Sequence, residues 1–334
     1  MAIYGAMSAL GITAGVALGG AITDWFGWRW VFFINVPIGL AVLAGSRALV
    51  EGERGSGSLG AASAILGTAA MALLAFGVTR AGEHGWSDIS TLAWLVSGAT
   101  MTAAFLWMQA RSQDPMLPLS LLTERNRAGS YGGMLLFGAG MMGTYYVLTL
   151  FMQQVMHYSP LRAGLSSLPF AIGIVVGAGV SSKLVERLAA RLVAGPGLLV
   201  GAAGMFWLSS VSPDSSYFAH IMPAAFLVSF GLGTSAIATT LTAVHGVTQQ
   251  RASVASAVVN MSQQLGAAFG IALLTAVATA GAEAHGGASS VGALAAGYSN
   301  AFAVGSALLL IASAVLALAV NTRETQGAGA GVAI

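Results

Sequence analysis

Long stretches without charged residues recur along the whole chain, and short polar segments separate them. About 20 apolar residues suffice for a helix to cross the hydrocarbon core of a bilayer. Ten of the stretches reach that length, which predicts ten membrane-spanning helices, with the last two centred near 255–280 and 300–320. The stretches lie at 1–23, 30–46, 55–79, 89–110, 128–156, 163–182, 192–213, 221–244, 252–282 and 286–322.

The positively charged residues are unequally shared between the two sides of this arrangement. Three of them, Arg29, Arg80 and Arg162, fall on one side, and ten fall on the other. Cytoplasmic loops carry an excess of Lys and Arg, so the side with ten is expected to be cytoplasmic. With ten spans, both termini are expected there too, and the loop 281–299 is expected outside the cell membrane. The ten are Arg47, Arg54, Arg111, Arg125, Arg127, Lys183, Arg187, Arg191, Arg251 and Arg323.

Composition supports the same fold class. Of 334 residues, 56% are hydrophobic and 7% are charged, and the mean hydropathy is +0.81. Soluble domains carry about 25% charged residues, so this chain has too few to cover a water-facing surface. We therefore expect an all-α, polytopic transmembrane bundle.

Several kinds of chemistry are excluded by residue type. The chain has no cysteine, which rules out disulfides, thiolate metal sites and cysteine nucleophiles. It has no long cluster of basic residues, which argues against nucleic acid as a partner. No G-x-S-x-G, H-E-x-x-H or phosphate-binding glycine loop occurs, so neither an enzyme, nor a cofactor, nor a metal site is expected.

The polar breaks divide the chain into sections. A flexible, Gly/Ser-rich linker and a charged loop separate three groups of helices, and a short Gly/Ala-rich tail follows them. The tail is expected to be disordered. The sections are a helix pair at 1–46, a cytoplasmic linker at 47–58, a second pair at 59–110, a cytoplasmic loop at 111–127, six helices at 128–320 and the tail at 321–334.

Glycines recur on one face of the first predicted helix, at Gly11, Gly15 and Gly19, with Gly20 beside them. This spacing alone is typical of close helix packing, for which we expect a partner in 173–179. The sequence that follows, from Asp24-Trp-Phe-Gly-Trp-Arg to Asn35-Val-Pro-Ile-Gly, changes the interpretation. Together the two stretches resemble the antiporter motif and following helix of major facilitator superfamily drug exporters, most closely the fourteen-helix drug:proton antiporters.

Further segments carry the same resemblance in the same order. They are 114–119 (DPMLPL), 153–164 (QQVMHYSPLRAG) and 255–266 (ASAVVNMSQQLG), so the resemblance covers nearly all of 1–322. One departure is Val16, where the family motif has proline, and the kink that proline would cause is therefore not expected.

The resemblance also implies an organisation. The first predicted helix matches the fifth helix of the family, so the first four are expected to be missing. Section 1–46 would then be the last two helices of a first bundle, 59–110 a two-helix insert, and 128–320 a complete second bundle.

Titratable residues avoid the predicted spans. All 11 acidic residues lie in loops or at span ends, and the five histidines lie near the interfaces. Proton coupling requires an ionisable group inside the membrane. The sequence shows no such group, so the chain by itself is not expected to perform proton-coupled export.

The resemblance implies that a substrate cavity lies between the predicted helices around 130–156 and 221–244. Tyr146 and Gln153 share a face of the first, and Phe226, Phe230 and Thr234 share a face of the second. An aromatic, sparsely polar pocket suits apolar or cationic drugs. The alternative is that these side chains face lipid or simply pack.

Two polar groups outside this cavity have open roles. Asn260 and Gln264 lie one turn apart and are either a polar gate between bundles or an interhelical hydrogen-bonding pair. Glu186, Arg187 and Arg191 lie in a loop that resembles the cytoplasmic gate motif of the family. The alternative for that loop is plain positive-inside anchoring.

The function implied by the resemblance is proton-driven efflux of hydrophobic or cationic drugs by alternating access. The expected partners are a small-molecule substrate, protons and membrane lipid. The alternative is a truncated, transport-incompetent fragment that acts at most as a membrane scaffold.

Overall fold

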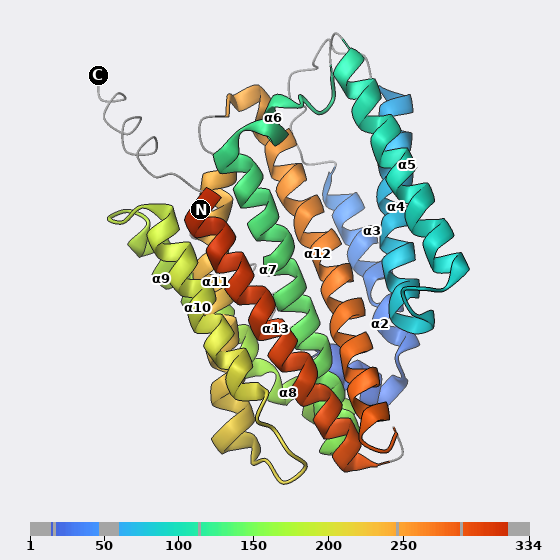
Figure 1. Ribbon diagram of the computed structural model, residues 1–334, viewed down its shortest axis with the longest axis vertical. Coiled ribbons are helices and arrows are strands. Elements are labelled where there is room, and N and C mark those ends of the chain that lie inside the picture. Colours follow the sequence, from blue (N-terminus) through green and yellow to red (C-terminus); the bar gives the residue numbers. More distant parts are fainter. Residues whose placement is uncertain are drawn as a thin grey trace.

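The computed structural model describes residues 15, 18–46, 60–112, 115–244, 247–287 and 290–319. These residues are mostly helical, and none of them lies in a strand (Figure 1). Residues 18–26 are helical. The other helices are α2 (Arg29–Phe33), α3 (Asn35–Gly45), α4 (Ala61–His84), α5 (Ile89–Arg111), α6 (Ser120–Thr123), α7 (Arg125–Leu150), η2 (Phe151–Val155), α8 (Pro160–Ser166), α9 (Leu168–Leu184), α10 (Ala190–Leu208), η3 (Tyr217–Ile221), α11 (Met222–Val244), α12 (Gln249–Ala284) and α13 (Val291–Ala319).

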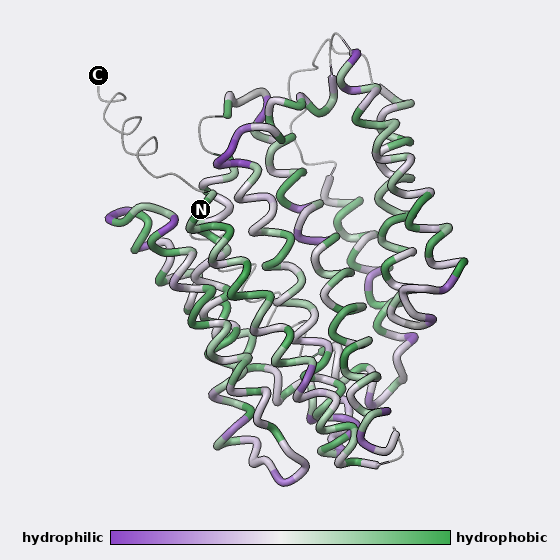
Figure 2. Tube along the Cα trace, viewed as in Figure 1, coloured by the Kyte–Doolittle hydropathy of each residue, from purple (hydrophilic) through white to green (hydrophobic). Residues whose placement is uncertain are grey.

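Eight of the ten predicted spans are confirmed as helices that are long and apolar enough to cross a membrane. The span predicted at 30–46 is found as a shorter apolar helix, Arg29–Gly45. Most of the span predicted at 1–23 lies outside the described residues. Figure 2 shows that hydrophilic residues gather mainly at the two ends of the long helices. The eight are Ala61–Gly82, Ile89–Arg111, Arg125–Val155, Pro160–Leu184, Ala190–Leu208, Tyr217–Val244, Arg251–Ala284 and Val291–Ala319.

Helices α7 to α13 form one bundle in which glycines let the backbones meet. A Cβ added to Gly197 of α10 would lie 2.9 Å from the carbonyl oxygen of Gly231 on α11. A Cβ added to Gly266 of α12 would lie 2.9 Å from the Cα of Leu135 on α7. No side chain fits at these contacts without displacing backbone, so the glycines set the spacing of the helices.

Hydroxyl groups tie α13 to α10 across the same bundle. Ser306 Oγ donates to the carbonyl of Ala202 at 2.8 Å, and Ser313 Oγ donates to the carbonyl of Gly195 at 3.0 Å. Both serines are buried. Such bonds add to interhelical packing where lipid offers no competing partner.

The connection between α12 and α13 differs from the prediction. The sequence placed an outside loop at 281–299, but α12 continues to Ala284 and α13 already begins at Val291. Gly297, predicted in the loop, lies inside α13, where an added Cβ would be 2.9 Å from the backbone nitrogen of Ala282. The segment is helical because its small residues let α13 pack directly on α12.

Helices α4 and α5 form a hairpin beside α12 (Figure 1). An added Cβ at Gly82 would lie 3.2 Å from the Cα of Ala272, and the rings of Trp86 and Phe269 are 6.0 Å apart. These two contacts place the last turn of α4 and the residues just after it against α12.

The predicted loop 111–127 contains α6 and the first turn of α7. Glu124 caps α7 by accepting hydrogen bonds from the backbone N–H groups of Asn126 and Arg127, both at 2.9 Å. Partial burial opposes ionisation of this carboxyl. The two backbone hydrogen bonds and the Arg127 guanidinium outweigh that effect and hold the pKa of Glu124 below its ordinary value.

Candidate functional site

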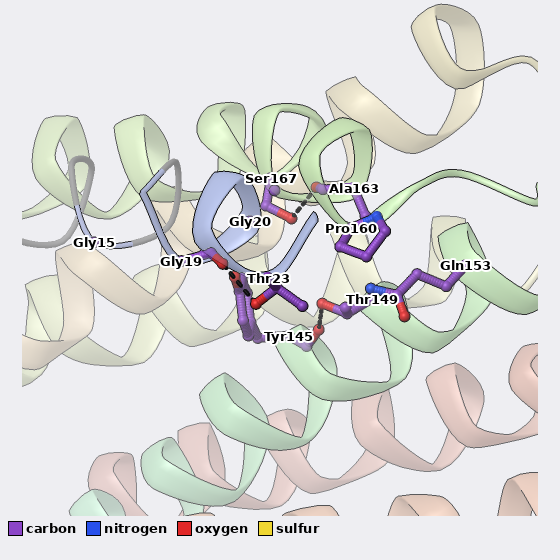
Figure 3. Close-up of a pocket in the computed structure, with 11 residues that line it drawn as sticks. Gly15, Gly19, Gly20, Thr23, Tyr145, Thr149, Gln153, Pro160, Ala163 and Ser167 are labelled. Carbon is purple, nitrogen blue, oxygen red and sulfur yellow. Dashed lines mark hydrogen bonds between the residues drawn. The ribbon is translucent and has the colours of Figure 1, made fainter. Parts of the chain in front are cut away.

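A cavity of about 440 Å³ lies between the N-terminal helical segment and the bundle (Figure 3). One wall is glycine backbone from the N-terminal segment, and the opposite walls come from α7, η2 and α8, together with Ser167 at the junction of α8 and α9. None of the lining residues is charged. They are Gly15, Gly19, Gly20, Thr23, Tyr145, Thr149, Gln153, Pro160, Ala163, Gly164 and Ser167.

Three hydroxyl groups around the cavity donate to their own helices. Thr23 donates to the Gly19 carbonyl at 2.7 Å, Thr149 to the Tyr145 carbonyl at 2.8 Å, and Ser167 to the Ala163 carbonyl at 2.9 Å. These donors are thus satisfied, and the oxygen lone pairs remain able to accept hydrogen bonds.

Gln153 differs from these hydroxyl residues. It is half-buried, and its amide makes no hydrogen bond with any other described side chain or backbone group. A free amide offers two donors and an acceptor. The Tyr145 ring, which lies 5.7 Å from the Phe170 ring, adds an aromatic surface to the same cavity. The cavity can therefore hold an aromatic or weakly polar group, which the Gln153 amide would orient by hydrogen bonds.

A π-turn brings Gln153 to this position. Residues Phe151–Val155 form η2, in which the backbone N–H of Met156 bonds the carbonyl of Phe151. A π-turn holds one more residue than an α-turn, so each residue advances by a smaller angle. Gln153 therefore turns toward the face of Tyr145 and Thr149.

Tyr146 was predicted to share a face with Gln153, on the assumption of a regular α-helix. The structure places Gln153 in the cavity, while Tyr146 is 41% exposed beside it and is not among the lining residues. Tyr146 is therefore not part of this cavity, and a face shared with Gln153 stays a prediction.

The predicted residues on α11 lie outside the cavity. Phe226 and Phe230 stack with their ring centroids 6.2 Å apart. Thr234 is buried and donates to the Phe230 carbonyl at 2.8 Å and to the Gly177 carbonyl of α9 at 3.3 Å. Thr234 thus belongs to the contact between α9 and α11 rather than to a pocket wall.

The glycine motif is divided between packing and cavity. Gly11 lies outside the described residues. An added Cβ at Gly20 would lie 2.9 Å from the Pro160 carbonyl, so Gly20 packs against α8. Apart from their own helix, Gly15 and Gly19 have no other described residue within 4 Å of an added Cβ and leave space for the cavity.

The predicted partner of Gly15 and Gly19 is corrected by the structure. An added Cβ at Gly173 would lie 2.8 Å from the Phe226 carbonyl, and one at Gly177 would lie 2.9 Å from the Thr234 backbone nitrogen, so α11 covers both. Gly179 has open space. A glycine-rich helix face predicts close packing, but it does not identify the helix that packs against it.

The two predicted polar groups remain apart from the cavity. Asn260 and Gln264 are exposed on α12, and Asn260 donates weakly to the Ser256 carbonyl of its own helix at 3.3 Å. Glu186 and Arg187 are exposed in the connection between α9 and α10, and neither makes an ion pair with another described residue. Arg191 lines a separate groove.

Sequence reasoning missed Tyr145, Thr149 and the wall from α8. Tyr145 and Thr149 are spaced by four, which is a detectable helical pattern, whereas Gln153 joins them through the π-turn. The contribution of Pro160 to Ser167 depends on how the chain folds back after η2, where His157 has a positive φ of 54°. No periodicity signals that turn.

The sequence profile of the Major Facilitator Superfamily matches residues 1–271. The chain belongs to this superfamily. Its members are membrane transporters rather than enzymes, and the long apolar helices agree that this major facilitator protein is an integral membrane protein.

Three relatives illustrate the kinship. Puromycin resistance protein pur8 of Streptomyces alboniger is 34% identical over 98% of this chain and 67% of the relative. Cephamycin export protein CmcT of Amycolatopsis lactamdurans is 35% identical over 95% and 65%. Multidrug resistance protein Stp of Mycobacterium tuberculosis is 29% identical over 83% and 52%. This major facilitator protein thus spans about half to two thirds of the length of these relatives.

Proposed function

We propose that the chain serves the proton-driven export of hydrophobic or cationic drug-like molecules by alternating access. The observation that carries the proposal is the uncharged cavity between the N-terminal segment and α7, η2 and α8, with the free amide of Gln153 at its edge. The walls combine small apolar residues and the Tyr145 ring with hydroxyl and amide groups, and uncharged pockets with a few placed polar groups are typical of small-molecule sites.

The relatives support the substrate class. Their names describe resistance to puromycin, export of cephamycin and multidrug resistance. These names give no support to the alternative of an inert membrane scaffold. The volume of about 440 Å³ falls within the range of about 300–1,000 Å³ for small-molecule pockets.

Alternating access gives the remaining polar residues their proposed roles. The cavity lies where an N-terminal segment meets the six-helix bundle, and rocking of these two parts would open it to one side at a time. Asn260 and Gln264, exposed on α12, would face the opposite bundle as a polar gate. Tyr146 and the stacked Phe226 and Phe230 would extend the aromatic surface toward that bundle.

We place the connections at 111–127 and 183–191, together with both termini, on the cytoplasmic side of the cell membrane. The excess of cations there supports this orientation. Glu186 and Arg187 would then act at the cytoplasmic mouth.

Binding of a fluorescent aromatic cation such as ethidium to the purified chain tests the site. Gln153→Ala should weaken binding several-fold because it removes the free amide. Gly19→Leu should weaken it more, because the side chain would project into open space that the ligand needs. Gly39→Leu is the matched control, since Gly39 likewise has no described residue outside its own helix within 4 Å of an added Cβ and does not line the cavity. Equal binding by all three variants would contradict the proposed site.

Transport is tested separately in proteoliposomes that carry an imposed pH gradient. Dye efflux that stops when the gradient is collapsed supports proton drive. Efflux that continues unchanged after collapse contradicts it while leaving export itself supported.

A further inference from the structure

A second cavity, the α10–α13 groove, lies on the outer face of the bundle. It has a volume of about 320 Å³ and runs between α10 and α13 near the end where α10 begins and α13 ends. Small residues make it hollow, because Gly195 and Pro196 line it from α10 and Ala317 from α13. Ser313 holds its floor together through the hydrogen bond to the Gly195 carbonyl.

The flanks of the groove are apolar and uncovered. Leu192 and Leu199 of α10 are 55% and 49% exposed, and Leu310 and Leu318 of α13 are 49% and 74% exposed. No described helix packs over them. In an integral membrane protein an uncovered apolar stripe of this kind contacts lipid acyl chains.

One cation lies at the mouth of the groove. Arg191 is half-buried, and it makes no hydrogen bond or ion pair with any other described residue. Arg125, at the same end, is already engaged, since its guanidinium donates to the Leu318 carbonyl at 2.8 Å. Arg191 is therefore a guanidinium with free donors beside an apolar channel.

The dimensions match a lipid rather than a free ion. Arg191 lies in the first turn of α10, and Leu199 lies eight residues further, about 12 Å deeper at 1.5 Å per residue. A phosphate held by Arg191 at the level of the headgroups would thus leave an acyl chain along Leu192 and Leu199. Pro196 also has no N–H to donate to the Leu192 carbonyl, which leaves an acceptor for a headgroup hydroxyl near the mouth.

We propose that the α10–α13 groove binds one anionic glycerophospholipid, with its phosphate on Arg191 and one acyl chain in the groove. Arg groups recognise phosphate by paired N–H donors, and basic pockets between membrane helices suit anionic headgroups. The site is on the opposite side of α10 from its glycine contact with α11, so it is independent of the proposed export function.

Native mass spectrometry of the purified full chain with added lipid tests the proposal. Phosphatidylglycerol should bind as a single tight adduct, and phosphatidylcholine should bind more weakly. Arg191→Gln should weaken phosphatidylglycerol about fivefold or more, as expected for the loss of about 1 kcal/mol from one cation near a lipid surface. Ala317→Phe should block the adduct by filling the groove. Arg187→Gln, which removes an exposed cation from the same connection but not from the groove, should have no effect.

Two results would overturn the proposal. One is unchanged phosphatidylglycerol binding in both Arg191→Gln and Ala317→Phe. The other is equally strong competition by glycerol phosphate or inorganic phosphate, which would show a simple anion site without a role for the acyl chain. Arg191→Gln removes the charge at the groove, and Ala317→Phe removes its space. If one of these variants misfolds, lipid binding by the other still tests the proposal.

Discussion

The six-helix bundle and the α4–α5 hairpin are equally apolar but are held together differently. In each hairpin helix, 11% of the most apolar stretch is buried, against 61% in Tyr217–Val244 of the bundle. In the bundle, glycines bring backbone against backbone, as between Gly197 and Gly231. In the hairpin, side chains fill the glycine contacts as well: Phe105 covers Gly67 with its nearest ring atom 3.2 Å from an added Cβ, and Leu74 faces Gly98 with both its side chain and its backbone.

This difference shows that hydrophobicity does not decide packing inside a membrane. Lipid solvates an apolar side chain as well as a neighbouring helix does, so close association requires small residues and interhelical hydrogen bonds. The bundle has both, and it forms the main walls of the substrate cavity. The hairpin can therefore contact lipid over most of its surface without loss of stability.

The largest expected effect follows from placing a side chain at a backbone contact of the bundle. Gly231→Leu should destabilise the protein by about 3 kcal/mol or more, because its Cβ would overlap the backbone of α10. Thermal unfolding of the purified chain measures the loss. Gly39→Leu, made on α3 where space is open, should be close to neutral. A comparable loss of stability in Gly231→Leu and Gly39→Leu would contradict the claim that glycine is required only where helices pack closely.

A change inside the hairpin should have a smaller and local effect. Gly98→Leu should cost about 1–2 kcal/mol, because an added Cβ would lie 2.9 Å from the backbone nitrogen of Leu74. Hydrogen exchange should then increase in 61–111 and stay unchanged in the bundle. Ser97→Leu, at the exposed neighbouring position, is the control. Faster exchange throughout α7 to α13 would show that the hairpin is an integral part of the bundle.

The contact between the N-terminal segment and α8 should be weaker still. Gly20→Leu should cost about 1 kcal/mol, because the segment can move away from the Pro160 carbonyl as a unit. Gly19→Leu should leave stability unchanged. Cysteines placed at Thr23 and Thr149, on two walls of the cavity, report the separation of the N-terminal segment from α7, since the native chain has no cysteine. Their cross-linking should be less efficient in the Gly20→Leu variant than in the parent. Efficient cross-linking in the Gly20 variant would contradict the proposed contact.

The smallest effect concerns the cap of α7. Glu124→Ala should cost about 0.5 kcal/mol at pH 7, at the low end for a helix cap because the site is partly solvated. The pKa of Glu124 is lowered on folding, so its contribution is complete above the ordinary value of 4.5 and is lost as the pH falls below it. The melting temperatures of the variant and the parent should therefore approach each other as the pH falls below 4.5. A constant difference from pH 7 to pH 3 would assign the effect to packing instead.

The sequence predicts the long helices well where charges mark their ends, as at Arg111 and at Lys183. It fails between α12 and α13, because residues 284–322 contain no Asp, Glu, Lys or Arg to mark the helix ends. A Gly/Ala-rich stretch also suits a loop and a packed helix equally. It also does not say that Tyr146 and Thr234 lie outside the lining of the cavity. Their assignment depends on a π-turn and on the pairing of α9 with α11, and neither feature has a local signal in the sequence.

The paired glycines of α10 and α11 also limit how this protein can evolve. Each of Gly197 and Gly231 meets the backbone of the facing helix, so enlarging one is not relieved by any change of the other. No order of single, tolerated substitutions leads from this pair to a larger one at the same helix spacing. Exposed positions outside the groove, such as Phe206 on α10 and Ile311 on α13, are under no such constraint, while the crossing of α10 and α11 is fixed by the glycine pair.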